Sequence, residues 1–75
     1  MTHKTFAAQR RALRVSQGRI ARLVGLSQPM ISQFELGNLV LRPDQIARLE
    51  NALRQEVETT ARNAERVGQM LGAQN

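Results

Sequence analysis

The sequence predicts an all-α fold of four to five helices, two of them short and joined by a tight turn, with an extended C-terminal helix. Residues 17–37 divide at Gly25 into two short segments whose apolar residues recur at helical spacing. Pro43 opens a last segment in which no helix breaker occurs before Gly68. The 75 residues, of which 41% are hydrophobic, make one domain with a core just large enough to be stable alone.

The first helix is expected over residues 5–14, with Phe6 and Leu13 on one face and Arg10 between them. An arginine on a buried face needs a carboxylate partner. The only acid among the first 42 residues is Glu35, on the apolar side of a later helix. We therefore predict a partly buried Arg10–Glu35 ion pair that holds the two helices together.

Two short helices are expected over residues 17–24 and 28–36. Gly25 can adopt the left-handed conformation that ends the first, and Ser27 is a suitable N-cap for the second. Ala21 is small enough for two helices to cross closely. This is the layout of a helix-turn-helix, whose second helix enters the major groove of DNA.

The last helix is expected to begin at Pro43 and to run to about residue 67. Either it is continuous or it breaks near residues 55–58, and the sequence alone leaves both possibilities open. We accordingly divide the chain into a DNA-binding domain, residues 1–54, and a C-terminal helical extension with a tail, residues 55–75.

The motif resembles that of the lambda-type repressor and Cro family of prokaryotic and phage regulators, over roughly residues 5–54. The positions that carry this resemblance are Gln17, Ile20, Ala21, Gly25, Leu26, Ser27, Gln28, Ile31, Ser32, Glu35 and Gly37. It implies a lambda-repressor-like domain that dimerises on a near-palindromic operator, and several family members carry an ion pair like Arg10–Glu35. Gly18 departs from the pattern, because a good helix former is expected there.

Composition argues against several other functions. The chain has no cysteine, no tyrosine and a single histidine, His3, which we expect in a frayed and solvated N-terminus. An enzyme would have few residues to use, and no cofactor, metal or small-molecule ligand is indicated. The sequence has neither a signal peptide nor an apolar run long enough for a membrane span, so we expect a cytoplasmic protein.

The charge of +5 is unevenly distributed along the chain. Residues 1–42 hold seven basic side chains and one acid, whereas residues 43–75 hold four arginines and five acids. The basic part also contains the helix-turn-helix. A basic patch attracts the phosphates of a nucleic acid, and with only two aromatic residues the chain favours duplex DNA over single strands.

Contacts to DNA bases are expected from the second helix of the motif. Gln28 is the first candidate, because a glutamine can bind adenine through N6 and N7 and this residue begins the helix. Gln33 and Ser32 follow. Pro29 and Met30 offer apolar surface to a thymine methyl group.

Contacts to the DNA backbone are expected from the flanks of the motif. The resemblance implies that Gln17 bonds a phosphate and supports the first residue of the second helix. It also points to the loop that contains Asn38 and Arg42, where family members commonly contact the DNA backbone or, through an arginine, the minor groove. The other candidates are Ser16, Arg14 and Arg19.

Two apolar surfaces are candidates for a dimer interface. One is the loop containing Leu39, Val40 and Leu41. The other is a C-terminal stripe at roughly heptad spacing, formed by Val57, Thr60 or Ala61, Ala64, Val67 and Leu71. Each set could instead cover the core of its own subunit.

The sequence thus predicts a sequence-specific regulator that binds double-stranded DNA, most simply a homodimeric repressor. The alternative is a protein–protein adaptor that keeps the fold without binding DNA. An adaptor is expected to carry acids or large apolar residues on the surface that holds Gln17, Gln28, Gln33 and Arg14, and this sequence has none there.

Overall fold

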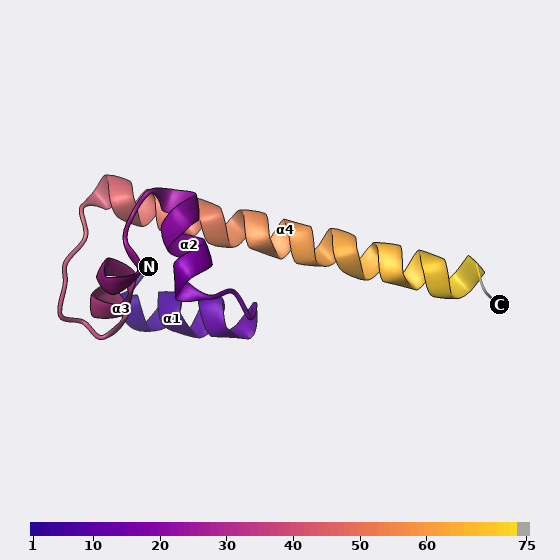
Figure 1. The fold of residues 1–75 in the computed structure, drawn as a ribbon, viewed down its shortest axis with the longest axis horizontal. Helices are drawn as coiled ribbons and strands as arrows, with labels where there is room; N and C mark the ends of the chain where they lie inside the picture. Colours follow the sequence, from indigo (N-terminus) through magenta and orange to yellow (C-terminus); the bar gives the residue numbers. More distant parts are fainter. Residues whose placement is uncertain (74–75) are drawn as a thin grey trace.

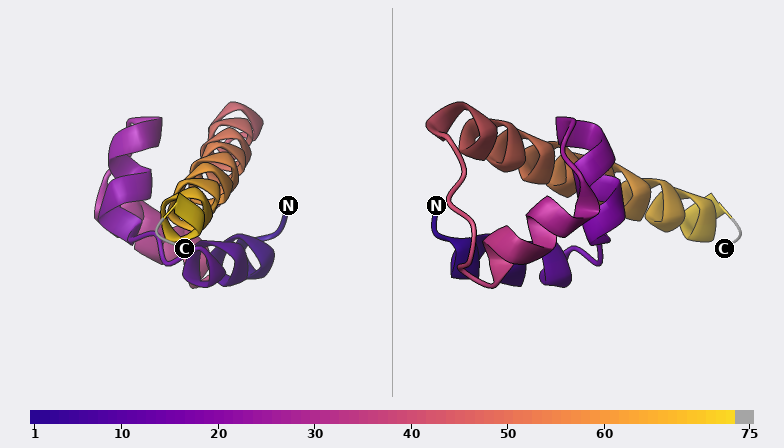
Figure 2. Two further views of the ribbon diagram at one scale, coloured as in Figure 1. Left: turned by 90° about the vertical axis from the view of Figure 1, so that its right-hand side faces the viewer. Right: turned by 60° about the vertical axis from the view of Figure 1, so that its left-hand side comes forward.

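A computed structural model describes the backbone of residues 1–73 and the side chains of residues 1–61. Its described residues form four α-helices and no strand, which confirms the all-α class. The helices are α1 (His3–Ala12), α2 (Gln17–Val24), α3 (Gln28–Glu35) and α4 (Pro43–Ala73). In Figure 1, α1, α2 and α3 gather around the first half of α4, and the second half of α4 projects beyond them. Figure 2 shows the same arrangement from two other directions.

Helix α1 begins and ends two residues earlier than the predicted range of 5–14. Thr2 is its N-cap, with the Oγ1 atom accepting a hydrogen bond of 3.1 Å from the backbone N–H of Thr5. The helix stops at Ala12, and Arg14 adopts a left-handed conformation with φ of 57°. A positive φ is uncommon for a residue with a side chain. The end of α1 could therefore not be predicted from a glycine, as the end of α2 was.

The predicted frayed N-terminus is wrong, because His3 is the first residue of α1 and is half-buried. Its ring packs edge-on against Phe34 at a centroid distance of 6.5 Å. Gly37 lies beside it with φ of +81°, and a Cβ atom at Gly37 would stand 3.0 Å from His3 Nε2. The absence of a side chain at Gly37 therefore permits both the left-handed turn after α3 and the close contact with His3.

The two short helices predicted on either side of Gly25 are present as α2 and α3. Ser16 and Ser27 are the N-caps of α2 and α3, and their hydroxyl oxygens accept bonds from the third residue of each helix. Gly25 ends α2 with φ of 73°. Pro29 lies in the first turn of α3, where its missing N–H removes no helical hydrogen bond.

Helix α4 is continuous from Pro43 to Ala73, so no break occurs at residues 55–58. Arg42 precedes it, and the backbone N–H of Arg42 donates a hydrogen bond of 2.9 Å to the side-chain oxygen of Gln45. No helix in the described part of the chain has both the length and the apolarity needed to cross a membrane.

The core lies where α1, α2 and α3 meet the first half of α4. Phe6, Ile20, Ile31 and Leu49 are fully buried at its centre. Leu41 is only 4% exposed and belongs to the same cluster, and Leu39 packs against it. The suggested dimer role of Leu41 is therefore wrong, because its side chain fills the core of its own chain.

Candidate nucleic-acid interface

Helix α3 presents an exposed, uncharged surface on the side away from Ile31 and Phe34. Gln28, Pro29 and Gln33 are exposed, and Ser32 is half-buried. Met30 is partly buried and packs against the core. It is therefore not the freely exposed apolar contact that the sequence suggested, because its flexible side chain fills space beside the core.

Gln28 lies against the first turn of α2. Its side-chain oxygen is 4.0 Å from the position that a Cβ atom would occupy at Gly18. Gly18 is the second residue of α2, where the helix is only beginning and a glycine costs less than in the interior. The residue that departs from the family pattern thus borders the first candidate base contact.

Gln33 is joined to the loop that follows α3. Its side-chain oxygen accepts a hydrogen bond of 3.1 Å from Nδ2 of Asn38. The bond leaves the amide nitrogen of Gln33 as a donor towards solvent. Two residues predicted for different roles, one for bases and one for the DNA backbone, are therefore neighbours on one exposed surface.

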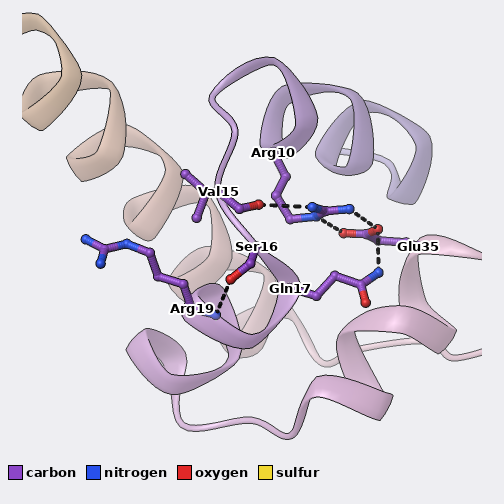
Figure 3. A network of polar contacts seen from close by, with 6 residues as sticks. All are labelled: Arg10, Val15, Ser16, Gln17, Arg19 and Glu35. Atoms are coloured by element: carbon purple, nitrogen blue, oxygen red, sulfur yellow. Dashed lines mark hydrogen bonds and ion pairs between the residues drawn. The ribbon is translucent and has the colours of Figure 1, made fainter.

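An ion pair between α1 and α3 lies directly behind this surface, as predicted. Arg10 donates from Nε to Oε2 of Glu35 at 2.5 Å and from Nη2 to Oε1 at 2.9 Å, a bidentate arrangement. Arg10 Nη1 also donates to the backbone oxygen of Val15 at 3.0 Å. Figure 3 shows Arg10 and Gln17 converging on Glu35 from α1 and α2.

The Glu35 side chain is 4% exposed and that of Arg10 is 11% exposed. Burial alone raises the pKa of Glu35, but hydrogen bonds from Arg10 and Gln17, together with the charges of Arg10 and Arg11, hold this pKa below its ordinary value. The hydrogen bond to Glu35 raises the pKa of Arg10 in turn. The pair is therefore ionised at neutral pH.

This lowered pKa predicts how stability depends on acid. The unfolded chain takes up a proton at Glu35 near the ordinary pKa of 4.5, before the folded chain does. The stabilisation from Glu35 is thus complete above about pH 4.5 and is lost as the pH falls through the lower folded pKa. Urea denaturation of the wild type and Glu35→Gln between about pH 7 and about pH 3 should show that their difference in stability shrinks as the pH falls. A difference that stays constant would contradict this role of Glu35.

Gln17 is half-buried and takes part in the same network. Its Nε2 donates a hydrogen bond of 3.0 Å to Glu35 Oε1. The amide nitrogen expected to bond a phosphate therefore already has an internal acceptor. Ser16 accepts a bond of 3.0 Å from the backbone N–H of Arg19, and its own hydroxyl proton stays free to donate to a phosphate at this end of α2.

Arg14 is the predicted phosphate contact with the most freedom. It is exposed, follows α1 and forms no ion pair with a described side chain. Arg42 is less free, because it pairs with Asp44 at 3.1 Å from Nε to Oδ1. The hydrogen bond from Arg42 lowers the pKa of Asp44.

Arg19, the remaining predicted phosphate contact, bonds Oε1 of Glu56 through Nε at 2.9 Å. Sequence reasoning missed this pair. Glu56 is buried, with 8% of its residue surface exposed, whereas the Arg19 side chain is about half exposed. The position of Glu56 in the sequence could have indicated this pair. Glu56 follows Leu49 and Leu53 on the apolar face of α4, and an acid on such a face needs a cationic partner.

The residues predicted to form a dimer interface differ in how far the structure describes and exposes their side chains. Val40 is 92% exposed and Val57 is 52% exposed, while Ala61 is also exposed. Ala64, Val67 and Leu71 lie on the helical backbone of α4 but outside the residues whose side chains are described.

Comparisons of the chain with protein-family models, curated proteins and solved structures find no match. Among the described residues, no group of three histidine or acidic side chains is placed to hold a metal ion. Function is therefore inferred from the geometry of α2 and α3 and from the distribution of charge.

Proposed function

We propose that this protein is a sequence-specific transcriptional regulator that binds double-stranded DNA in the cytoplasm. In this proposal it resembles the lambda-type repressors and Cro proteins and acts as a homodimeric repressor on a near-palindromic operator. Helix α3 enters the major groove, where Gln28 and Gln33 meet base edges. Ser16 and Arg14 contact the flanking phosphates.

The main support is that α3 presents exposed amides, while residues 1–42, the basic part of the chain, expose no acidic side chain. The only carboxylate in that part of the sequence is Glu35, and its side chain is 4% exposed and paired with Arg10. The pairing with Arg10 thus neutralises, away from the surface, the one negative charge of residues 1–42 that would repel DNA phosphates. Arg11, Arg14 and other basic residues of the same part remain at the surface.

Duplex DNA fits this surface better than a single strand. Proteins that bind single strands commonly stack the bases on exposed aromatic side chains. The only two aromatic residues of the chain, apart from its histidine, are Phe6 and Phe34, which are 0% and 5% exposed. Neither can serve as a stacking platform.

Arg14→Ala should weaken binding to all duplexes alike, because a phosphate contact carries no base information. The plot of log affinity against log salt should become shallower by about 0.9, the value for one lost phosphate contact. Fluorescence anisotropy at several salt concentrations measures this slope. Arg48→Ala, which removes an exposed arginine from α4, is the control, and an equal change in both variants would remove Arg14 from the interface.

Selection of bound duplexes from a random pool tests the proposed function. The expected result is enrichment of one near-palindromic sequence, with binding that weakens as salt increases. A protein–protein adaptor with this fold would enrich no sequence. Binding that is equally tight for all duplexes would also contradict the proposal, because it would show attraction to phosphates without base recognition.

A further inference from the structure

The turn that ends α3 holds Asn38 beside Gln33. The backbone N–H of Gly37 donates a hydrogen bond of 3.0 Å to the backbone oxygen of Phe34. The backbone N–H of Asn38 donates another, of 2.9 Å, to the backbone oxygen of Gln33. Gly37 has φ of 81°, so these two bonds form a Schellman motif, a common left-handed end of an α-helix. The backbone therefore fixes where Asn38 lies relative to Gln33.

Other contacts hold the same turn against the body of the protein. The ring of His3 in α1 lies beside Gly37, where a Cβ atom would be 3.0 Å from Nε2. The same ring packs edge-on against Phe34. Leu39, which follows the turn, packs against the core. Asn38 is thus an exposed residue on a turn that is anchored on both sides.

The side chains of Asn38 and Gln33 also bond to each other. Asn38 Nδ2 donates a hydrogen bond of 3.1 Å to Gln33 Oε1. In a planar amide the oxygen and the nitrogen lie on opposite sides, so this bond leaves the –NH2 group of Gln33, with its two donors, facing away from the turn. Gln28 differs, because its side chain forms no hydrogen bond within the described part of the chain.

The arrangement with both amides turned over would also form one hydrogen bond. It would place the oxygen of Asn38 against the carboxyl end of α3, where unpaired backbone carbonyls carry a partial negative charge. A donor is favoured at this end of a helix and an acceptor is not. The –NH2 group of Asn38 therefore faces α3, and the oxygen of Gln33 faces Asn38.

We propose that Asn38 makes Gln33 a reader of guanine. Held in this way, Gln33 offers only donors to the major groove, and guanine presents two adjacent acceptors there, O6 and N7, which one lysine nitrogen can also bind. Adenine needs an oxygen to accept from N6 as well as a donor to N7, which the unpartnered Gln28 can supply. Asn38 is thus a positioning residue that acts through Gln33. The inference rests on the proposed function, since it requires α3 to lie in the major groove.

The identity of one operator base pair is the first test. Selection from a random pool gives the operator, and Gln33→Ala identifies the position that Gln33 reads, because this variant loses its preference there. We expect a G·C pair at this position. Replacing its guanine by 7-deazaguanine, which lacks the N7 acceptor, should weaken binding of the wild type but not of Gln33→Ala.

Variants of Asn38 test whether this residue sets the preference. The measured quantity is the ratio of affinities for the operator with the G·C pair and for one with A·T in its place, the purine staying on the same strand. Asn38→Ala should lower this ratio by about two- to tenfold, the usual effect of one hydrogen bond. Asn38→Asp should reverse it, because a carboxylate only accepts hydrogen bonds and would turn the Gln33 oxygen towards adenine N6. Repulsion of phosphates by the new charge acts on both operators and cancels in the ratio.

Asn51→Ala and Asn51→Asp are the matched controls, since Asn51 is exposed on α4, and neither should change the ratio. Thermal denaturation checks that the Asn38 variants keep the fold. The inference alone would be overturned by an A·T pair at the Gln33 position, by the lack of any position at which Gln33→Ala loses its preference, or by an unchanged ratio in both Asn38 variants. A wild type that enriches no sequence would contradict the proposed function itself.

Discussion

Arg10→Met is expected to lower the free energy of unfolding by about 3–5 kcal/mol, the usual cost of leaving a buried charge without its partner. Glu35 would lose both hydrogen bonds from the guanidinium while its side chain stays 4% exposed. The backbone oxygen of Val15 would lose its donor as well. Methionine is unbranched and fills much of the same space. The decrease in the free energy of unfolding is therefore due mainly to the missing charge and hydrogen bonds.

Two further variants make the result specific to the pair. Arg11→Met removes the same charge from an exposed neighbour and should change stability by less than about 0.5 kcal/mol. The double variant Arg10→Met with Glu35→Leu should recover much of the lost stability, because an apolar pair of similar size often replaces a buried ion pair without loss. Urea denaturation measures all three, and equal effects of Arg10→Met and Arg11→Met would show that the pair contributes nothing to stability.

Gln28→Ala is expected to reduce affinity for the selected operator by about 1–3 kcal/mol, roughly five- to 150-fold. The reason is that the variant loses a bidentate contact to one base pair, most simply an adenine. Its affinity for random duplex should change little, and its preference at one operator position should weaken. Gln28 is exposed on the first turn of α3, and the substitution leaves the core unaltered.

Gln55→Ala is the matched control for this measurement, since Gln55 is an exposed glutamine on α4. Binding of both variants to operators with each base pair changed in turn locates the lost contact. An equal loss of affinity on operator and random duplex would assign Gln28 to a phosphate contact or to the fold, and would contradict base recognition by this residue.

Much of the fold could be predicted because its signals are local. The caps at Ser16 and Ser27, the left-handed Gly25 and the proline that begins α4 each act within one turn of a helix. The Arg10–Glu35 pair could also be predicted, although its members are 25 residues apart. One basic residue lay on an apolar face, and only one acid was available in that part of the sequence.

The errors concern features that depend on tertiary contacts. The aromatic packing of His3, the burial of Leu41 and the partial burial of Met30 follow from which surfaces meet in space. The Arg19–Glu56 pair was missed because no partner was sought for Glu56, whose burial depends on the packing of α4 against α2. Applying to Glu56 the same charge-balance reasoning that found Glu35 would have identified it.

Amide chemical-shift mapping of the labelled protein, titrated with the selected operator duplex, tests most directly whether α3 reads DNA. The account predicts that the largest changes fall on the backbone amides of residues 28 and 30–33 and of residues 14–17, with little change on α4. Unchanged α3 amides alongside large changes on α4 would contradict it.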